Sequence, residues 1–356
     1  MEQFQKANEV NASHYPYLSQ KIIEIYLNGD LDNVEEVLVE PSFGYVTKIN
    51  YIDGSNRITK GNDIGVNLAS STHLAKDKGH TKLLLNAIGI NTPEGRDYIM
   101  PWWADEISIN YSENEKLPGH QIVDADEYIT SVIKYPVYIK PVNGSLGRGI
   151  HKVFDSNELE ELIEDYNSSR VKVAVIEKSI DYPDYRLVVM DEELIFANLR
   201  SPFSVVGDGE STIKDLIMKT REEHINLGRE IKIKEDDPRI QINLDRQNLS
   251  FDNILNKYQI LKLLNVSNLS AGGTSEEVKG DISDRWIDIA SYIANNFGLR
   301  LIGLDIAIKD IHDYESDYSV IEVNSSPGFN HYAMSGHVQE KKVSDFIRRV
   351  INSIPE

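Results

Sequence analysis

Residues 301–328 read LIGLDIAIKDIHDYESDYSVIEVNSSPG, with the apolar run LIGLDIAI at the start and a second apolar run, YSVIEVN, after a polar segment. Both runs have the length and residue types of β-strands, and the polar connection allows them to pair antiparallel. Side chains two apart on a strand share a face, so we expect Glu322 and Asn324 to point the same way. Antiparallel pairing would place Asp305 beside them.

This pair of strands predicts a magnesium site. Asp305 interrupts a run that otherwise looks buried, and a cation is the natural compensation because a carboxylate without a partner is costly to bury. Three hard oxygen donors with incomplete coordination suit Mg²⁺ when nucleotide phosphates supply the remaining ligands. The alternative is a hairpin face exposed to water, since strict alternation also explains Glu322 and Asn324. Residues 325–328, Ser-Ser-Pro-Gly, end the second strand at once, as expected where backbone approaches a ligand.

Composition limits the classes of function. The chain has 356 residues, 40% of them hydrophobic, which is enough for two or three packed units. With no cysteine, only oxygen or imidazole ligands are available to a metal. A net charge of −20 argues against nucleic acid or an anionic membrane as partner, although a few lysines focused in a cleft can still attract a nucleotide. We find no membrane-spanning run and no signal peptide, so we expect a cytoplasmic location.

The hydropathy pattern predicts an α/β (α+β) protein of three units. A small N-terminal α/β unit covers residues 1–75, a second unit covers 76–180 and a third covers 181–356. In the first unit we expect a helix from Leu18 to Leu27 and strands in VEEVLVE and FGYVTKINYI.

The second and third units alternate helical and strand patterns. One helical pattern runs through HLAKDKGHTKLLLNAIG, where Lys78 and Lys82 share a face and Gly89 suits a C-cap. Asp155 suits the N-cap of the helix SNELEELIEDYN. Residues 231–250 are expected to be rich in loops. The other expected helices are STIKDLIMKTREEHINL, DRWIDIASYIANNFG and KKVSDFIRRVINSI, and the other strands are YPVYIKPV, GIHKVF, VKVAVIEKSI, DYRLVVM and ELIFANLR.

A glycine-rich turn follows a lysine in YIKPVNGSLGRGI, residues 138–150. Gly144, Ser145 and Gly147 lie in this turn, where backbone N–H groups can approach phosphate oxygens while Lys140 supplies a positive charge. The order of residues is neither a P-loop nor a dinucleotide fingerprint, because a strand and not a helix follows the glycines. The alternative is an ordinary hairpin loop.

A further segment suits the polar edge of adenine. Glu177, Lys178, Ser179 and Ile180 end an apolar strand, where backbone groups can form hydrogen bonds to the base. Asp184 follows in the next loop, where a carboxylate can accept hydrogen bonds from both ribose hydroxyls. The alternative is a surface loop between two units.

Taken in order, these motifs resemble the ATP-grasp superfamily from about Gly61 onward, and within it the ATP-grasp modules of cyanophycin synthetase and of the fused glutamate–cysteine ligase/glutathione synthetase. Each motif alone is weak, but the combination is specific. The likeness is carried by AKDKGHTKLLLNAIGINTPEG, YPVYIKPVNGSLGRGI, DYRLVVM, SPFSVVGDGESTIKDLI, SNLSAGG and VIEVNSSPG.

The resemblance implies an ATP-grasp fold, in which two α+β subdomains clamp ATP. It implies a carboxylate–amine ligase that forms an amide through an acyl-phosphate and releases ADP and phosphate. Lys78 and Lys140 would contact the phosphates of ATP, and Lys78 is preferred to Lys82, which lies on the same helix face. Asp305, Glu322 and Asn324 would bind two Mg²⁺ ions, for which Mn²⁺ can substitute.

The resemblance also implies residues around the reacting groups. Arg186 and Arg200 are expected, together with Lys140, to act on the transferred phosphoryl group or the substrate carboxylate. The candidates for binding the substrate are Ser270, Gly272, Gly273, Ser326, Gly328 and His331.

Two departures leave the substrate open. Relatives of the D-alanine ligase type carry arginine where this chain has Gly303, and the second catalytic domain of both resembling proteins has no counterpart here. The expected partner is a free amino acid or small peptide. The alternatives are a ribosomal precursor peptide whose side chains are modified, and a non-catalytic ATP-binding module. A homodimer is a further expectation.

Aromatic and histidine residues add weaker hypotheses. Trp102 and Trp103 could line a recognition surface, although adjacent tryptophans more often pack in part against a core. His224, His312 and His337 match no zinc spacing and are interpreted as solvated side chains. His331 is kept as a candidate because it follows the Ser-Ser-Pro-Gly segment.

Overall fold

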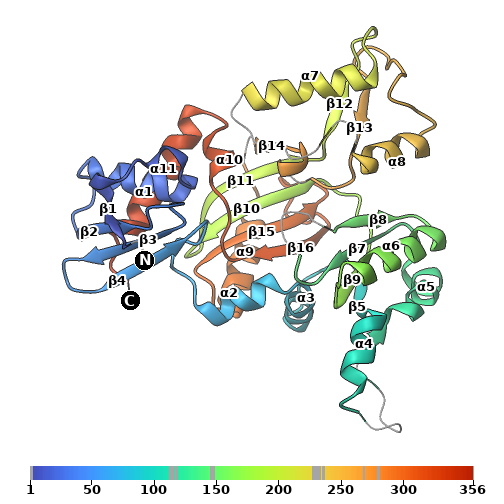
Figure 1. Ribbon diagram of the computed structural model, residues 1–356, viewed down its shortest axis with the longest axis horizontal. Helices are drawn as coiled ribbons and strands as arrows, with labels where there is room; N and C mark the ends of the chain where they lie inside the picture. The colour runs from blue at the N-terminus through green and yellow to red at the C-terminus, as the bar shows by residue number, and fades with distance from the viewer. Residues whose placement is uncertain are drawn as a thin grey trace.

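The computed structural model describes residues 3–111, 117, 119–144, 149–226, 234, 237–267, 269–278 and 281–355. Its main parts are an N-terminal unit, a small subdomain and a large sheet with an appended module (Figure 1). Among the helices in these ranges, none has both the length and the apolar character needed to cross a membrane. The limits 1–75, 76–180 and 181–356 stay a prediction.

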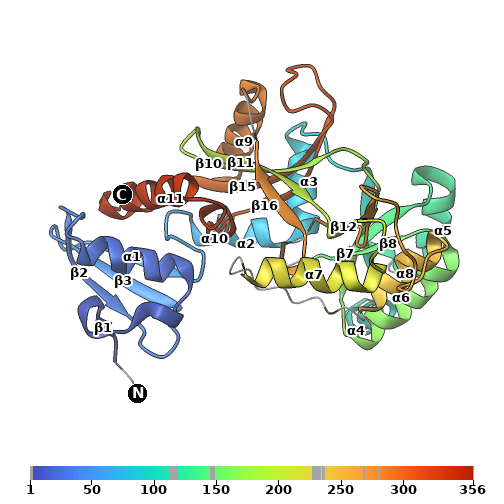
Figure 2. The ribbon, with the colours of Figure 1, turned by 90° about the horizontal axis from the view of Figure 1, so that it is seen from above.

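The N-terminal unit combines residues from both ends of the chain. Its antiparallel sheet contains β1 (Gln5–Lys6), β2 (Val34–Val39), β3 (Val46–Tyr51) and β4 (Asn56–Lys60), in that order. Alternate residues of the central strands point inward onto α1 (Tyr17–Leu27). The C-terminal helix α11 (His337–Asn352) lies beside α1 in the same core, as Figure 2 shows. The hydroxyl of Tyr51 donates a hydrogen bond to the Ile351 carbonyl at 2.9 Å.

The helix predicted through residues 73–89 is in fact two helices, α2 (Ala69–Lys76) and α3 (Lys78–Ala87). Asp77 lies between them in an extended conformation, and its side chain accepts a hydrogen bond from the His80 N–H at 2.9 Å. Aspartate at this position caps the second helix and so interrupts the first. Lys78 therefore begins α3, where its N–H donates to the Val142 carbonyl at 3.0 Å. Gly89 ends α3 with φ of +78°, as predicted.

The small subdomain is built on a five-stranded sheet in the order β6-β5-β9-β7-β8, in which only β5 and β6 are parallel. Its apolar side chains form a core with α6 (Ser156–Ser168). Asp155 caps α6 as predicted, accepting from two N–H groups. The strands are β5 (Gly95–Ile99), β6 (His120–Gln121), β7 (Val137–Pro141), β8 (His151–Val153) and β9 (Val173–Lys178), and the other helices are α4 (Pro101–Ser108) and α5 (Ala125–Tyr128).

The large sheet is fully antiparallel, in the order β14-β11-β10-β15-β16. Alternate residues of β15, such as Ile302 and Leu304, pack against α9 (Asp284–Phe297). Leu301 points to the opposite face of the sheet and joins the N-terminal core. Asp305 lies on that same face of β15, four residues further along the strand. The strands are β10 (Asp184–Met190), β11 (Glu193–Ser201), β14 (Thr274–Glu277), β15 (Leu301–Ile308) and β16 (Tyr318–Asn324).

A module with its own apolar core is appended to this sheet. It contains the paired strands β12 (Ser204–Val206) and β13 (Ile260–Lys262), with α7 (Ile213–Asn226) and α8 (Pro238–Arg246). The prediction that residues 231–250 are rich in loops is wrong at α8, which Asp237 caps and whose buried Ile240 and Leu244 belong to the core of the module. The Tyr138 hydroxyl donates to the Asn265 carbonyl at 2.7 Å and links the module to β7.

Candidate active site

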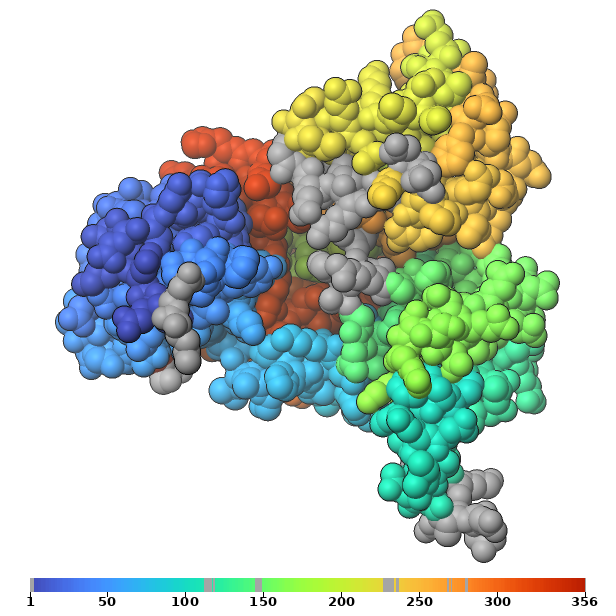
Figure 3. Space-filling model, viewed as in Figure 1, coloured from blue at the N-terminus to red at the C-terminus, as the bar shows by residue number. Residues whose placement is uncertain are grey.

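A pocket lies where α3, β7 and β9 meet β16, between the small subdomain and the large sheet. Figure 3 shows the surface hollowed between the N-terminal unit, α2 and α3, and the small subdomain. The polar residues that line the pocket include Lys78, Lys82, Lys140, Glu177 and Glu322.

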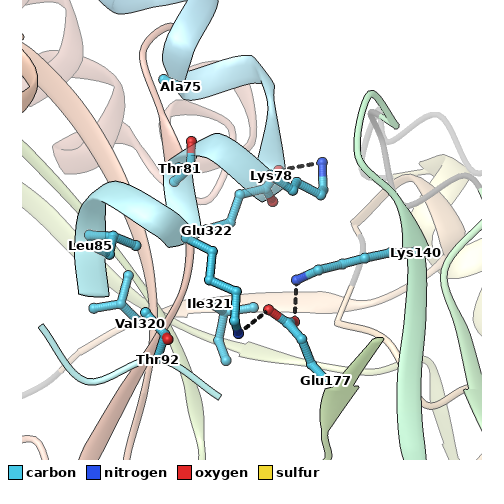
Figure 4. Close-up of a pocket in the computed structure, with 11 residues that line it drawn as sticks. Ala75, Lys78, Thr81, Leu85, Thr92, Lys140, Glu177, Val320, Ile321 and Glu322 are labelled. Atoms are coloured by element: carbon cyan, nitrogen blue, oxygen red, sulfur yellow. Dashed lines mark hydrogen bonds and ion pairs between the residues drawn. The ribbon is translucent and has the colours of Figure 1, made fainter. Parts of the chain in front are cut away.

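On the small-subdomain side, one carboxylate bridges two lysines. Glu177 Oε2 lies 2.5 Å from Lys140 Nζ, and its Oε1 lies 2.8 Å from Lys82 Nζ. Figure 4 shows Lys140 and Glu177 pointing toward each other across the pocket. All three residues are buried. Burial alone would raise the pKa of Glu177, but the two ammonium groups hold it below its ordinary value, so the carboxylate is ionised.

Lys78 connects this cluster to the large sheet. Its Nζ donates to the Gly144 carbonyl at 2.5 Å and lies 3.1 Å from Glu322 Oε1. Because Lys78 begins α3, the helix end places its ammonium group between the glycine-rich turn and β16. Gly144 is the last described residue of this turn before the gap at 145–148. Ser145 and Gly147, predicted to bind phosphate, lie outside the described residues.

On the large sheet, Asp305 bridges two arginines. Strand register aligns it with Arg186 on β10 and Glu322 on β16. Its Oδ2 accepts from the terminal nitrogens of Arg186, at 2.7 Å, and Arg200, at 2.9 Å, while its Oδ1 accepts from Arg186 Nε. The two guanidinium groups thus neutralise this buried carboxylate, and the magnesium predicted beside it stays a prediction. Although burial opposes ionisation, the two arginines hold the pKa of Asp305 below its ordinary value.

Asp184 lies on the same face of the sheet, in register with Arg200 on one side and Ala307 on the other. Burial raises its pKa well above that of an ordinary aspartate, and the charge of Asp305 adds to this effect. Its Oδ1 has no hydrogen-bond partner in the described part of the chain. Contact with a ribose stays a prediction for this residue.

The donors predicted for magnesium fit that ion by chemical type. Asp305 and Glu322 are register partners, and Asn324 shares a face with Glu322. Within the described ranges, Asn324 Nδ2 is buried without a partner, and rotating the amide would aim its oxygen at the same space. Within those ranges no group of three His, Cys, Asp or Glu residues is placed to hold a metal, so the predicted set of Asp305, Glu322 and Asn324 includes an amide oxygen and stays a prediction.

Residues 325–328 cover Gly303, the position at which relatives of the D-alanine ligase type carry arginine. A Cβ atom at this position would lie 2.8 Å from Pro327 Cβ, because residues 325–328 fold over the sheet there. A side chain as large as arginine has no room. Asn67 fixes the segment by donating to the Ser325 carbonyl at 2.7 Å.

The remaining predicted residues lie around this centre, and their roles stay predictions. Ser326 and Gly328 belong to the segment over Gly303, and His331 lies in α10 (Asn330–Ala333). Gly272 and Gly273 precede β14, and Gly272, at φ of +87°, packs on the Phe203 ring. Ser270 precedes them, and its side chain lies outside the described atoms. Lys178 ends β9, and Ser179 and Ile180 continue toward Asp184.

The two tryptophans are occupied within the small subdomain. Trp102 Nε1 donates to the Val171 carbonyl at 2.7 Å, and the Arg170 guanidinium lies 4.8 Å from the center of one of its rings. Lys172 Nζ lies 3.9 Å from the Trp103 ring. These intramolecular contacts favour the interpretation of the tryptophans as packing residues.

Three residues of this region were not among the predicted site residues. The sequence favours Lys78 over Lys82, yet both ammonium groups reach the pocket because the two residues lie one turn apart on α3. Asn198 and Glu277 align with Arg186 and Asp305 across the sheet. Sequence periodicity could have indicated Lys82, whereas Asn198 and Glu277 depend on the register of distant strands.

Comparison with known proteins gives relatives for most of the chain, although no family model matches it. Cyanophycin synthetase from Crocosphaera subtropica is 31% identical over 271 residues, which cover 73% of this chain and 28% of that protein. The glutathione biosynthesis bifunctional protein GshAB from Enterococcus faecalis is 24% identical over 320 residues, covering 87% of this chain and 38% of that protein.

A similar fold occurs in the crystal structure of a bifunctional glutathione synthetase from Pasteurella multocida. The TM-score is 0.55 at 19% identity, over 93% of this chain and 44% of that one. The chain thus matches about a third of the length of these curated relatives.

Proposed function

Because this chain belongs to the ATP-grasp superfamily, we propose that it is an ATP-dependent carboxylate–amine ligase acting on an amino acid or small peptide. The observation that carries the proposal is the meeting of two charged clusters, which the ion pair between Lys78 and Glu322 joins at the pocket. Three lysines gather on the small-subdomain side, and Asp305, Glu322 and two arginines gather on the large sheet. Cations suited to phosphate thus face acids suited to a metal.

The reaction takes place in two steps. An oxygen of the substrate carboxylate attacks the γ-phosphorus of ATP, the bond to the β,γ-bridging oxygen breaks, and ADP leaves. The amine then attacks the carbonyl carbon of the acyl-phosphate, inorganic phosphate leaves, and the nitrogen loses a proton. A carboxylate does not react with an amine at neutral pH, so the first step is the purpose of ATP.

The residues of this chain position the reactants and neutralise charge. Lys78, Lys82 and Lys140 hold the phosphates of ATP by exchanging their carboxylate partners for phosphate oxygens. Arg186 and Arg200 stabilise the charge that spreads over the transferred phosphoryl group. Asp305, Glu322 and Asn324 would hold magnesium, which neutralises phosphate charge when bound. No covalent nucleophile is required.

Trapping the activated carboxylate tests the proposal without knowledge of the amine. The protein is incubated with ATP, Mg²⁺, pools of amino acids or short peptides, and hydroxylamine, which converts an acyl-phosphate to a hydroxamate. We expect ADP and hydroxamate to form in equal amounts and only with a carboxylate present. ADP release without hydroxamate, or no carboxylate-dependent release from any pool, would exclude the ligase.

A further inference from the structure

Beyond Arg186, the charged row of the large sheet continues toward the outer strand β14. Asn198 on β11 is in register with Arg186, and Glu277 on β14 is in register with Asn198. Ser275 is the register partner of Arg200. The side chains of one row share a face, so these residues extend the site face away from Glu322.

Hydrogen-bond acceptors dominate this end of the row. Asn198 is 5% exposed, and its Nδ2 donates to Ser275 Oγ at 2.8 Å. The Asn198 Oδ1 is buried and has no hydrogen-bond partner among the described residues. A buried carbonyl oxygen without a donor is costly, so this atom calls for a ligand that brings one. The neighbouring Glu277 carboxylate is a second acceptor.

Glu277 is fixed in place from the other side. Tyr332 of α10 donates to its Oε1 at 2.5 Å, and Gln339 of α11 donates to its Oε2 at 2.6 Å. Lys342 Nζ lies 3.6 Å from Oε1 in a loose, partly exposed ion pair. The simpler interpretation is that Glu277 only anchors the two helices. That interpretation leaves the Asn198 oxygen unexplained, and it leaves 34% of the Glu277 side chain exposed.

We propose that Asn198 and Glu277 bind a cationic group of the carboxylate substrate, such as the free amino terminus of a short peptide. This inference rests on the proposed function, because it takes the activated carboxylate to lie at Arg186 and Arg200. Each substrate N–H would meet an acceptor, the Asn198 Oδ1 or the Glu277 carboxylate. The subsite would thus select for a positive charge remote from the reacting carboxylate.

The sheet geometry sets the length of this substrate. Neighbouring strands lie about 4.8 Å apart, so Glu277 is roughly 10 Å from Arg186, two strands away. From Arg200 it is a diagonal neighbour, about 7–8 Å away. An extended peptide spans about 3.3–3.6 Å per residue. Two or three residues, or one long basic amino acid, therefore match the separation, whereas the α-amine of a simple amino acid is too close to its carboxylate.

Calorimetric binding of defined peptides to the full chain tests the subsite independently of turnover. The probes are di- and trialanine with their N-acetylated forms, and lysine with norleucine, all with a non-hydrolysable ATP analogue and Mg²⁺. We expect each probe with the remote ammonium group to bind at least tenfold more tightly than its partner without that group. In Glu277→Gln this preference should fall below threefold, while affinity for the ATP analogue stays unchanged.

Equal affinity in the wild-type protein for probes with and without the remote ammonium group would overturn the proposal. It would also be overturned by a Glu277→Gln variant that weakens both members of each pair to the same extent, as expected for a mere anchor. Glu193→Gln is the matched control, because Glu193 forms an exposed ion pair with Arg349 at 2.8 Å and should retain the full preference. Failure of the hydroxamate assay with a retained preference would reject the ligase function but not the cation subsite.

Discussion

The two charged clusters of the site have the same arrangement, a buried carboxylate between two cations, built from different residues. Glu177 bridges Lys82 and Lys140, which come from separate elements, α3 and β7. Asp305 bridges Arg186 and Arg200, which come from the adjacent strands β10 and β11. Lysine is a mobile point charge, whereas arginine presents a planar fork. The lysine side can therefore release its carboxylate to follow phosphates, and the arginine side holds a fixed geometry.

The ionised side chains around each bridging carboxylate determine the net charge of that cluster. Three lysines and Glu177 leave two positive charges on the small-subdomain side. On the large sheet, two arginines face Asp305, Glu322 and, when ionised, Asp184, which leaves one negative charge. A chain with a net charge of −20 thus keeps a local positive cluster, which the proposed function assigns to phosphate, beside an acidic cluster that it assigns to a metal.

The largest effect should come from Asp305→Asn. This change removes a metal donor and the anion that orients both arginines, so we expect carboxylate-dependent ADP release to fall by about a thousandfold. Asp191→Asn is the matched control, because Asp191 forms an exposed ion pair with Arg300 and should keep normal turnover. If Asp305→Asn retained a tenth of the wild-type activity, the arginine cluster would not have the fixed catalytic geometry that distinguishes it from the lysine cluster.

Glu177→Gln should mainly affect stability. The substitution leaves two buried ammonium groups without their anion, and breaking a buried pair in this way costs about 3–5 kcal/mol in the free energy of unfolding. Urea titration measures the loss, and ATP should restore more stability in this variant than in the wild type. If the unfolding midpoint does not shift, the lysines do not depend on Glu177.

Lys82→Met tests whether the lysine side binds phosphate. Loss of one charge-assisted contact should weaken ATP binding by about 10–100-fold. The exposed Lys76 at the end of α2 provides the comparison, since Lys76→Met should leave the dissociation constant unchanged. Equal affinities in the two variants would confine the nucleotide contacts to Lys78 and Lys140.

A smaller effect should come from the ionisation of Glu177, seen in how the free energy of unfolding depends on pH. Because the pKa of Glu177 is lowered in the folded state, its contribution is present above the ordinary glutamate pKa and is lost as pH falls below it. Between pH 5 and 3, stability of the wild type should fall more steeply than that of Glu177→Gln, by at most about 1.4 kcal/mol per pH unit. Parallel curves would show that Glu177 has an ordinary pKa.

The sequence predicted the part of the site that local periodicity determines. The period of two along β16 predicted the shared face of Glu322 and Asn324, and the short connection predicted their antiparallel pairing with the strand of Asp305. The same reasoning extended one helix too far at Asp77, because the apolar spacing continues across a residue that caps the next helix.

Partners from distant strands could not be predicted in this way. The arginines that neutralise Asp305 lie more than 100 residues away, and their position depends on the register of β10 and β11. β14 reads Thr-Ser-Glu-Glu, a polar stretch with no hydrophobic alternation, so nothing local marks Glu277 as part of the site face.

The contact between Tyr51 and Ile351 has a consequence for how the protein is made. The two residues are 300 positions apart, and α11 supplies part of the core on which the first sheet rests. During synthesis the N-terminal strands emerge from the ribosome long before α11 has been translated. Until then, inward-facing residues such as Ile49 have an incomplete apolar surface to pack against, which exposes the nascent chain to aggregation. We expect the first unit to be the last to reach its final form.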